Sequence, residues 1–547
     1  MDHFPWLSVV TFAPLAGAVV LAFLPRSKES AAGWWALVVT VAVFGLSVAM
    51  LSAYHGQQAG YQLIDRATWV KSLGFQYLLG VDGISVFLVL LTTFLFPIAV
   101  LASWRGVRNP KLYFGSFLVL ETAVIGSFVA LDLLLFFVFF EALLVPMYMI
   151  IGGWGGERRA YAAVRFFIFT MAGSAFLLAA ILFLSFQAAA QLGHPTFDVT
   201  QLARLSLSAA AGRWLFLGFF VAFAVKVPLV PLSTWQPDAY AEAPTAGTLV
   251  LAALLAKVGA YGLIRFNLSL FPDASSTFRD LALALAVIAI LYGAIAATVQ
   301  TDVKRLIAYS SLSHTGFIVL GIFAFTVTAA SGSVLYMVNH GLSTGALFLL
   351  VGMLGERIGT NDLRRMGGLG ARIPVLAGVF LFMALASMGL PGLNNFVSEF
   401  LVLLGTFASA EPYAVAAVTA LVLAAIYLLW AYQRAFHGVP AVAGAADEPS
   451  IAGDGHGRPA PEHHGGLRDL RAVEYAILVP LIAAVLWLGV YPKPLLSRIE
   501  PATRRTVECV RPGSTDTSVD VIVTPSTQAA LCGGAFHGSL RPIGVQP

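Results

Sequence analysis

The feature that most constrains this chain is a series of long apolar stretches that recurs from one end to the other. Each stretch has about 18–25 residues, enough for a helix to cross roughly 30 Å of hydrocarbon. Of the 547 residues, 59% are hydrophobic and only 11% are charged, which is too little charge to cover the surface of a soluble protein. The stretches are continuously apolar rather than alternating, which excludes a transmembrane β-barrel. We therefore predict an all-α membrane protein.

The apolar stretches predict about fourteen transmembrane helices. The first has no Ala-x-Ala-like cleavage site before Pro25, so we predict a true span rather than a removed signal peptide. The predicted spans are 4–24, 33–53, 83–104, 112–130, 133–152, 163–187, 214–240, 246–268, 279–300, 304–327, 331–355, 374–409, 413–436 and 472–491.

Loops rich in Arg and Lys fall on one side of the predicted bundle. The positive-inside rule makes this side cytoplasmic, which places both termini on the external side. The formal net charge of +4 is explained by these loops, so it does not indicate nucleic-acid binding. The basic residues are Arg26, Lys28, Arg105, Arg108, Lys111, Arg158, Arg159, Lys304, Arg305, Arg357, Arg364, Arg365, Arg372, Arg434 and the arginines of 458–471.

Two predicted spans contain helix-breaking residues. The seventh carries Pro228 and Pro231, and because proline has no N–H, the carbonyls of Ala224 and Val227 would lose their helical partners. The twelfth carries Gly389-Leu-Pro391-Gly392 and is too long for one straight crossing. Broken backbone at membrane depth is tolerated only inside protein or beside water. The two breaks therefore indicate a transport site.

The breaks lie five spans apart, which is the pattern of two inverted five-helix repeats, spans 4–8 and spans 9–13. Turn-forming residues after the second repeat predict a flexible cytoplasmic linker, and polar residues at the end predict an external tail. An external tail permits a disulfide between Cys509 and Cys532, with two free thiols as the alternative. The predicted parts are three N-terminal spans in 1–111, the first repeat in 112–268, the second in 279–437, the linker in 438–471, the last span in 472–491 and the tail in 500–547.

Ionisable side chains occur at membrane depth in several predicted spans. A charge there costs roughly 2.5–3.5 kcal/mol, so five ionised groups would cost about 15 kcal/mol, as much as the whole stability of an ordinary domain. They must pair, hydrate or become neutral, and groups that do so can act as a proton relay. The candidates for proton translocation are Glu121, Glu141, Lys226, Lys257, His314, His340 and Glu399.

Structural roles are the alternative for some of these groups. Glu141 and Lys226 could form a buried structural ion pair, and Glu121 could be a satisfied core carboxylate. The two histidines could hydrogen-bond to backbone or serine. Lys304 lies near a span end, from which its side chain could reach the cytoplasmic interface. We find no phosphate-binding glycine loop, metal cluster or nucleophile triad in the sequence.

Six motifs resemble those of the antiporter-like membrane subunits of respiratory complex I. Within that family the chain resembles the M type, because the L and N types usually carry Lys where this chain has Glu399. The motifs are Val81-Asp82-Gly-Ile-Ser85, Leu131-Asp132-Leu-Leu-Leu-Phe-Phe-Val-Phe-Phe-Glu141, Lys226-Val-Pro-Leu-Val-Pro-Leu-Ser-Thr-Trp-Gln-Pro-Asp238, Ala243-Pro-Thr-Ala-Gly247, Lys257-Val-Gly-Ala-Tyr-Gly-Leu263 and Asp302-Val-Lys-Arg-Leu-Ile-Ala-Tyr-Ser-Ser311.

The resemblance implies a role for each candidate residue. Relatives often carry His at the positions of Ser233 and Tyr240, so these two are not counted as proton carriers. Pro228, Pro231 and Pro391 would mark the broken helices. Glu141 and Lys226 would form a pair at the channel entrance with Glu121 close by, Lys257 would be the central carrier, His314 and His340 would line a hydrated axis, and Glu399 would be the carboxylate of the second half.

The resemblance also implies a place in a larger enzyme. The chain would be a proton-translocating, non-redox subunit of NADH-quinone oxidoreductase in the bacterial inner membrane, beside L- and N-type subunits. FMN, iron–sulfur clusters and quinone would belong to partner subunits, and no cofactor or metal would bind this chain. The alternatives are a subunit of an Mrp-type cation/proton antiporter and a membrane subunit of an energy-converting hydrogenase.

Overall fold

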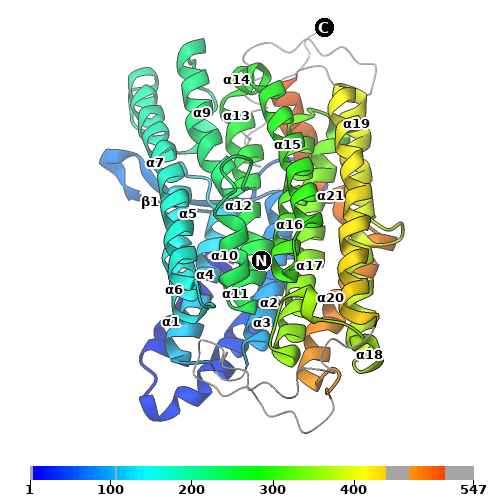
Figure 1. The fold of residues 1–547 in the computed structure, drawn as a ribbon. Coiled ribbons are helices and arrows are strands. Elements are labelled where there is room, and N and C mark those ends of the chain that lie inside the picture. Colours follow the sequence, from blue (N-terminus) through cyan, green and yellow to red (C-terminus); the bar gives the residue numbers. More distant parts are fainter. Residues whose placement is uncertain (1–3, 105–106, 439–466, 512–547) are drawn as a thin grey trace.

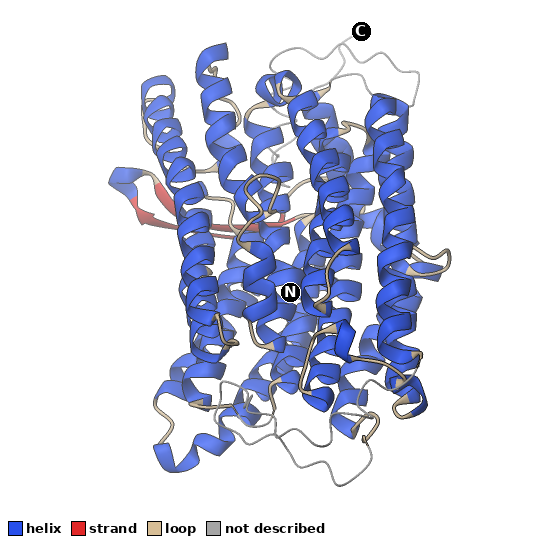
Figure 2. Ribbon diagram, in the orientation of Figure 1, coloured by secondary structure: helices blue, strands red, loops and turns tan. Residues whose placement is uncertain are grey.

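The computed structural model describes residues 4–104, 107–438 and 467–511. These residues form a bundle of helices that run side by side, with one pair of strands lying across it (Figures 1 and 2). In the described part of the chain, 12 helices are long and apolar enough to cross a membrane, and Trp6–Ala22 and Pro374–Ser387 are shorter apolar helices. The prediction of an all-α membrane protein is confirmed.

The helices of the first half follow the predicted spans closely. The seventh span is divided in two, and α9 ends at Lys226. The helices are α1 Trp6–Ala22, η1 Arg26–Ala31, α2 Ala32–Ala53, α3 Ser85–Ala102, α4 Pro110–Val129, α5 Leu133–Ala142, α6 Leu144–Trp154, α7 Arg159–Leu192, α8 Val199–Leu202, α9 Ala209–Lys226 and α10 Gln236–Glu242.

The eighth span, Thr245–Leu270, is one run of helix that changes its winding twice. Two π-helical segments interrupt the α-helix, and each shifts the hydrogen-bond register by one residue. The elements are α11 Thr245–Val250, η3 Leu251–Leu255, α12 Ala256–Gly262, η4 Leu263–Asn267 and α13 Leu268–Leu270, followed by α14 Pro272–Thr277.

The second half contains the other broken span. A break between α18 and α19 divides the twelfth span, and the non-helical backbone of Ala410 separates it from the thirteenth inside the long α19. The elements are α15 Arg279–Thr298, α16 Val303–Phe323, α17 Val327–Ile358, η5 Leu363–Arg365, η6 Leu369–Ala371, α18 Pro374–Ser387, α19 Asn394–Phe436, α20 Ala472–Val490 and α21 Lys493–Val510.

A β-hairpin connects the second and third spans, and it was not predicted from the sequence. Strands β1 (Gln62–Val70) and β2 (Phe75–Val81) pair antiparallel, with Gly74 in the left-handed conformation at the turn. Leu79 of β2 also bridges to Ala130 at the end of α4. The hairpin therefore gains its stability from contacts with helices, which an isolated two-stranded hairpin lacks.

Two pairs of aspartates reveal the repeat that the sequence did not show residue by residue. Asp132 caps the start of α5 and bridges to Asp198, while Asp302 caps the start of α16 and bridges to Asp362. In each half, the first aspartate of the pair begins a span. The second aspartate lies just before the broken span, which is two spans further along the chain. The matching pairs support the division into spans 4–8 and 9–13.

The predicted start of the external tail at residue 500 is wrong. Residues up to Val510 belong to helix α21, which packs against α17. Leu495, Ile499 and Ala502 are buried at helical spacing, so the helix has one apolar face despite Pro501. Residues 439–466 of the predicted linker and 512–547 of the predicted tail, including Cys532, lie outside the described residues.

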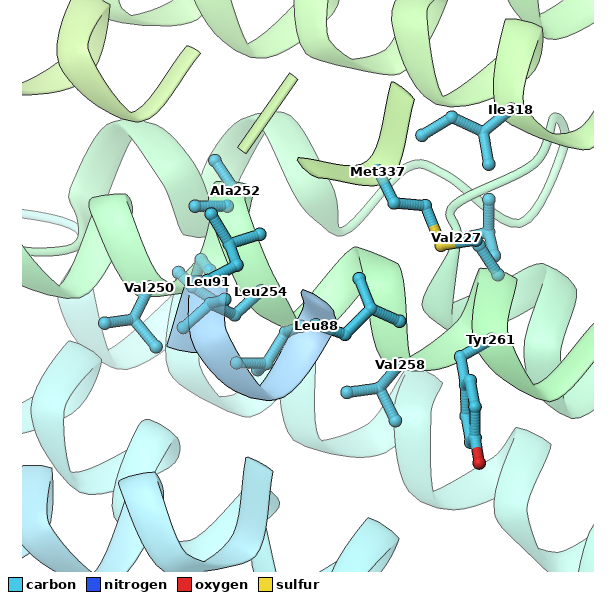
Figure 3. Packing of buried hydrophobic residues seen from close by; sticks show 14 of the residues in the cluster. Leu88, Leu91, Val227, Val250, Ala252, Leu254, Val258, Tyr261, Ile318 and Met337 are labelled. Atoms are coloured by element: carbon cyan, nitrogen blue, oxygen red, sulfur yellow. The ribbon is translucent and has the colours of Figure 1, made fainter. Parts of the chain in front are cut away.

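Apolar side chains fill the space between the spans (Figure 3). Leu88 and Leu91 of α3 lie against the eighth span, where the figure labels Val250, Leu254 and Val258. All five are buried in the same hydrophobic cluster. Polar groups at the centre of the bundle are therefore enclosed by hydrocarbon and depend on one another for hydrogen bonds.

Candidate functional site

The break in the seventh span is satisfied mostly by its own backbone and side chains. Leu229 N donates to the carbonyl of Ala224 at 2.7 Å, and Trp235 Nε1 donates to that of Val225 at 3.0 Å. The expectation that Pro228 leaves the Ala224 carbonyl without a partner is therefore wrong. The chain compensates by bonding one residue further along, as in a wide helical turn.

Lys226 is the last residue of α9 and is 1% exposed. Its ammonium lies 4.4 Å from the centre of the Phe140 ring, a cation–π contact. It has no hydrogen-bond partner among the described residues. The aromatic face thus stabilises an ammonium group that donates no hydrogen bond to a carbonyl.

Glu141 follows Phe140 directly in the chain and is the acidic residue whose charge acts on Lys226. Glu141 and Lys226 do not form a direct ion pair in the described part of the chain. The ion pairs found there have N···O distances of 2.5–3.5 Å. Glu121 of α4 is fully buried, and neither of its oxygens has a hydrogen-bond partner among the described residues. The structure thus brings Glu141 and Lys226 together but joins Glu121 to neither of them.

Lys257 lies at the centre of the eighth span, between the two π-helical segments. Its Nζ donates to the carbonyl of Ala252 at 2.7 Å, and this carbonyl belongs to η3. A π-helical turn widens the helix and redirects a carbonyl, which gives the buried ammonium an acceptor in its own helix. Nζ also lies 2.5 Å from Nδ1 of His340 on α17.

Beyond His340, further polar contacts lie within the second half of the chain. The rings of His340 and His314 have centroids 5.6 Å apart, and Nδ1 of His314 lies 2.6 Å from the hydroxyl of Tyr336. That hydroxyl donates to Oε1 of Glu399, which lies 3.5 Å from His314 Nδ1. All four side chains are buried. The structure therefore places three buried polar side chains between Lys257 and Glu399, with hydrogen-bond contacts at both ends and none between His340 and His314 among the described residues.

The break before α19 positions Glu399. Asn339 of α17 and Asn394 at the start of α19 each donate to the backbone carbonyl of the other, at 2.7 and 3.0 Å. Gly389 has a φ of +76°, and a Cβ there would lie 2.1 Å from Oε2 of Glu399. Glycine at this position thus supplies both the left-handed turn and the room for the carboxylate.

Tyr336 was missed in the sequence. It lies four residues before His340, so the two share one face of α17, and this spacing was the available signal. Tyr240, one of the two positions where relatives often have His, donates to the carbonyl of Leu251 at 3.2 Å, and Ser233 is buried. Tyr240 thus meets the same π-helical segment that serves Lys257.

Two further charge clusters lie at the ends of the bundle. Arg265 of η4 forms a buried ion pair of 2.5 Å with Asp82. Asp238 of α10 binds Arg165 of α7 at 2.5 Å and Arg305 of α16 at 2.7 Å. Asp238, the last residue of the motif that begins at Lys226, therefore joins a helix of the first repeat to a helix of the second.

The Lys304 side chain was expected as one alternative to reach the cytoplasmic interface, but its ammonium is held by carbonyls inside the protein. Lys304 is 8% exposed and donates to the carbonyls of Ala241 and Ala243 at 3.0 and 2.6 Å.

At the surface, hydrogen bonds from Arg364 hold the pKa of Asp362 below its usual range. Within the described residues, no cluster of three or more His, Cys, Asp or Glu could hold a metal ion.

Comparison with known families covers most of the chain. Residues 130–424 match the transmembrane family described as NADH:quinone oxidoreductase/Mrp antiporter, and residues 18–131 match the amino terminus of NADH-ubiquinone oxidoreductase chain 4. NADH-quinone oxidoreductase subunit M of Mycobacterium tuberculosis H37Rv is 41% identical, over 93% of this chain and 95% of that protein. The subunit M of Rhodobacter capsulatus is 40% identical, over 92% and 96%.

Solved structures agree on the fold. A chain of respiratory complex I from Thermus thermophilus with bound NADH superposes with a TM-score of 0.81 and 31% identity, over 92% of this chain and 99% of that one. A chain of the Mrp complex from Dietzia superposes with a TM-score of 0.79 at 21% identity, over 96% and 99%. The second match shows a shared fold alone.

The fold is that of the antiporter-like membrane subunits of respiratory complex I. The protein belongs to the NADH:quinone oxidoreductase/Mrp antiporter transmembrane family, within the branch of the NADH-quinone oxidoreductase subunit M proteins. The sequence-based assignment to this family and branch is confirmed.

Proposed function

We propose that this chain translocates protons outward as part of a respiratory NADH-quinone oxidoreductase. The observation that carries the proposal is the set of buried polar side chains between Lys257 on the eighth span and Glu399 on the second broken span. Lys257 contacts His340, and Tyr336 contacts both His314 and Glu399. Burying so many ionisable groups is expensive, and a proton relay gives each of them a use. Glu141 and Lys226 would load the series at the first broken span.

The driving energy would come from redox chemistry in other subunits. FMN, iron–sulfur clusters and quinone would lie in those subunits, and L- and N-type subunits would be neighbours in a bacterial inner membrane. Both termini would lie on the external side. Moving one charge against the membrane potential requires roughly 2.3 kcal/mol per 100 mV, which sets the scale of the work.

The test is the exchange of Lys226 or Glu141 for Ala in the assembled complex, reconstituted into sealed vesicles. We expect fewer protons translocated per NADH oxidised, with the subunit composition unchanged. A variant that keeps the wild-type ratio would contradict the proposal. Glu121→Gln in the same assay asks whether the carboxyl on α4 takes part.

The second candidate is a subunit of an Mrp-type cation/proton antiporter, since the Dietzia Mrp chain has the same fold. Relatives at about 40% identity that are named NADH-quinone oxidoreductase subunit M favour the first candidate. The proteins that co-purify in mild detergent decide between them. NADH oxidation by the purified assembly supports the first, and sodium-dependent proton exchange without NADH oxidation supports the second.

A further inference from the structure

The hydrogen bonds around His340 fix the position of its ring proton. Its Nδ1 lies 2.5 Å from Nζ of Lys257. When Lys257 carries its proton, its ammonium group has three donors and no acceptor, so Nδ1 of the neutral His340 ring accepts. The proton of His340 is therefore assigned to Nε2, which has no partner among the described residues.

The hydrogen bonds around His314 fix the opposite arrangement. The hydroxyl of Tyr336 donates to the carboxylate of Glu399. Its oxygen then accepts from Nδ1 of His314, at 2.6 Å. The ring proton of His314 is therefore on Nδ1, and its Nε2 is an acceptor that also lacks a partner in the described part of the chain.

The two unpartnered nitrogens are complementary. His340 Nε2 is a donor, His314 Nε2 is an acceptor, and the ring centroids are 5.6 Å apart. Buried polar atoms are almost always hydrogen-bonded, so the two are expected to be joined, either through one bridging water or by a small rotation of a ring. Once these two nitrogens are joined, each donor in the series points away from Lys257 and toward Glu399.

We propose that Tyr336 carries protons in a polarised wire that runs from Lys257 through His340 and His314 to Glu399. The proposal rests on the proposed function and adds to it a carrier and a direction. Tyr336 is a carrier because its hydroxyl accepts from His314 and donates to Glu399. The direction follows from the two ring tautomers, which differ because the partners of the two Nδ1 atoms differ.

One transfer along the wire conserves every atom and charge in it. Lys257 gives a proton to His340 Nδ1, and His340 Nε2 passes its own proton to His314 Nε2. His314 Nδ1 passes its proton to the oxygen of Tyr336, and the hydroxyl proton of Tyr336 moves to Glu399. Lys257 and Glu399 finish neutral, while the three carriers finish neutral with their donors reversed. A second proton cannot follow until the rings and the hydroxyl reorient.

A direct step from His314 to Glu399 would bypass Tyr336, and its geometry is poor. Nδ1 and Oε1 are 3.5 Å apart, longer than the roughly 2.7–3.2 Å of an N–H···O hydrogen bond. The hydroxyl of Tyr336 is closer to both groups. The alternative, that Tyr336 only holds Glu399 in place, makes no use of its contact with His314.

The test is Tyr336→Phe in the assembled complex in sealed vesicles, with Tyr113→Phe as the matched control. Tyr113 of α4 is also buried, and its hydroxyl pairs with that of Ser103 at 2.7 Å. We expect proton translocation by Y336F to slow at least about 100-fold, as for loss of a positioned proton-transfer group. Y113F should translocate at the wild-type rate. Wild-type translocation by Y336F overturns the wire.

Lys257→Met in the same vesicles separates the two levels of the proposal. Loss of translocation in K257M together with wild-type translocation in Y336F refutes the role of Tyr336 and leaves the proposed function intact. Wild-type translocation in both variants refutes the proposed function as well. Loss in both, with Y113F unaffected, supports the wire.

A second measurement distinguishes a carrier from a positioning group and also serves if Y336F assembles poorly. Site-specific 3,5-difluorotyrosine at position 336 nearly preserves the volume and keeps the hydroxyl, but makes it more acidic. A proton carrier responds with a changed translocation rate and a changed solvent deuterium effect. An unchanged rate and an unchanged deuterium effect would overturn the proposal.

Discussion

The Nζ atom of Lys257 lies 2.5 Å from Nδ1 of His340, and this contact joins the eighth span to α17. Lys257 comes from the first repeat and His340 from the second. The π-helical segment η3 supplies the carbonyl of Ala252, which holds the ammonium at 2.7 Å. A change in helix winding thus places the group at which the two halves meet.

Lys257→Met should abolish proton translocation, because Met fills a similar volume but cannot hold a proton. We expect a loss of at least about 100-fold, the lower range for a proton-transfer group. Protons translocated per NADH in sealed vesicles are the measurement. Lys111→Met is the control, since Lys111 Nζ also donates to backbone carbonyls, those of Ala22 and Leu24, but lies at the start of α4 and is only partly buried. An equal effect of both changes would contradict this role.

Gly389→Ala and Gly392→Ala should differ in function although both strain the backbone. Both glycines have positive φ, at +76° and +92°, so each alanine costs about 1–2 kcal/mol. Only the Cβ at position 389 meets Glu399, whereas position 392 opens into free space. We therefore expect both variants to lower thermal stability and only G389A to reduce translocation. A reduction of the same size in G392A would show that strain alone is responsible.

Asp82→Ala should destabilise the fold strongly, because it leaves the guanidinium of Arg265 buried without its carboxylate. Breaking a buried pair costs about 3–5 kcal/mol. The control is Glu500→Ala, which removes an exposed i,i+4 pair with Arg504 and should cost less than about 1 kcal/mol. Apparent melting temperatures of the purified complex test the contrast. Similar shifts in both variants would mean that the Asp82–Arg265 pair contributes little.

Asp238→Asn should loosen the contact between the two repeats, because the carboxylate binds Arg165 and Arg305 at once. Both arginines are partly exposed, so each pair is worth no more than about 1 kcal/mol. Hydrogen exchange should therefore become faster in α10 and at the start of α16. Asp273→Asn, an exposed acid at the start of α14, is the control. Unchanged exchange in D238N would contradict the bridging role.

Much of the fold was predictable because hydrocarbon requires long apolar helices. The spans, both breaks and the family followed from continuous apolar stretches, from Pro228, Pro231 and Pro391, and from the motifs. The β1–β2 hairpin and the helical start of the tail were not predicted. Both depend on packing against helices that are distant in sequence, such as Ala130 at the end of α4 and the helix α17 beneath α21.

The sequence was enough to predict which ionisable residues belong to the site, but not which of them contact one another. Insertion cost singles out Glu121, Glu141, Lys226, Lys257 and Glu399 in any apolar stretch, because each costs energy wherever it points. The expected pair of Lys226 and Glu141 makes no direct ion contact among the described residues, and the Lys226 ammonium lies on the Phe140 ring instead. A neutral Tyr336 carries no such cost, so hydropathy gave no sign of it.

The sequence by itself determined that this is a membrane bundle with charges inside it, because hydropathy and charge are properties of each stretch alone. Only the tertiary structure decided which charges meet. Lys257, which lies between the two π-helical segments, contacts His340, and Glu399, which follows the break at Gly389, accepts from Tyr336. Hydrogen bonds act over about 3 Å and depend on direction, so they are set by how helices from the two repeats pack.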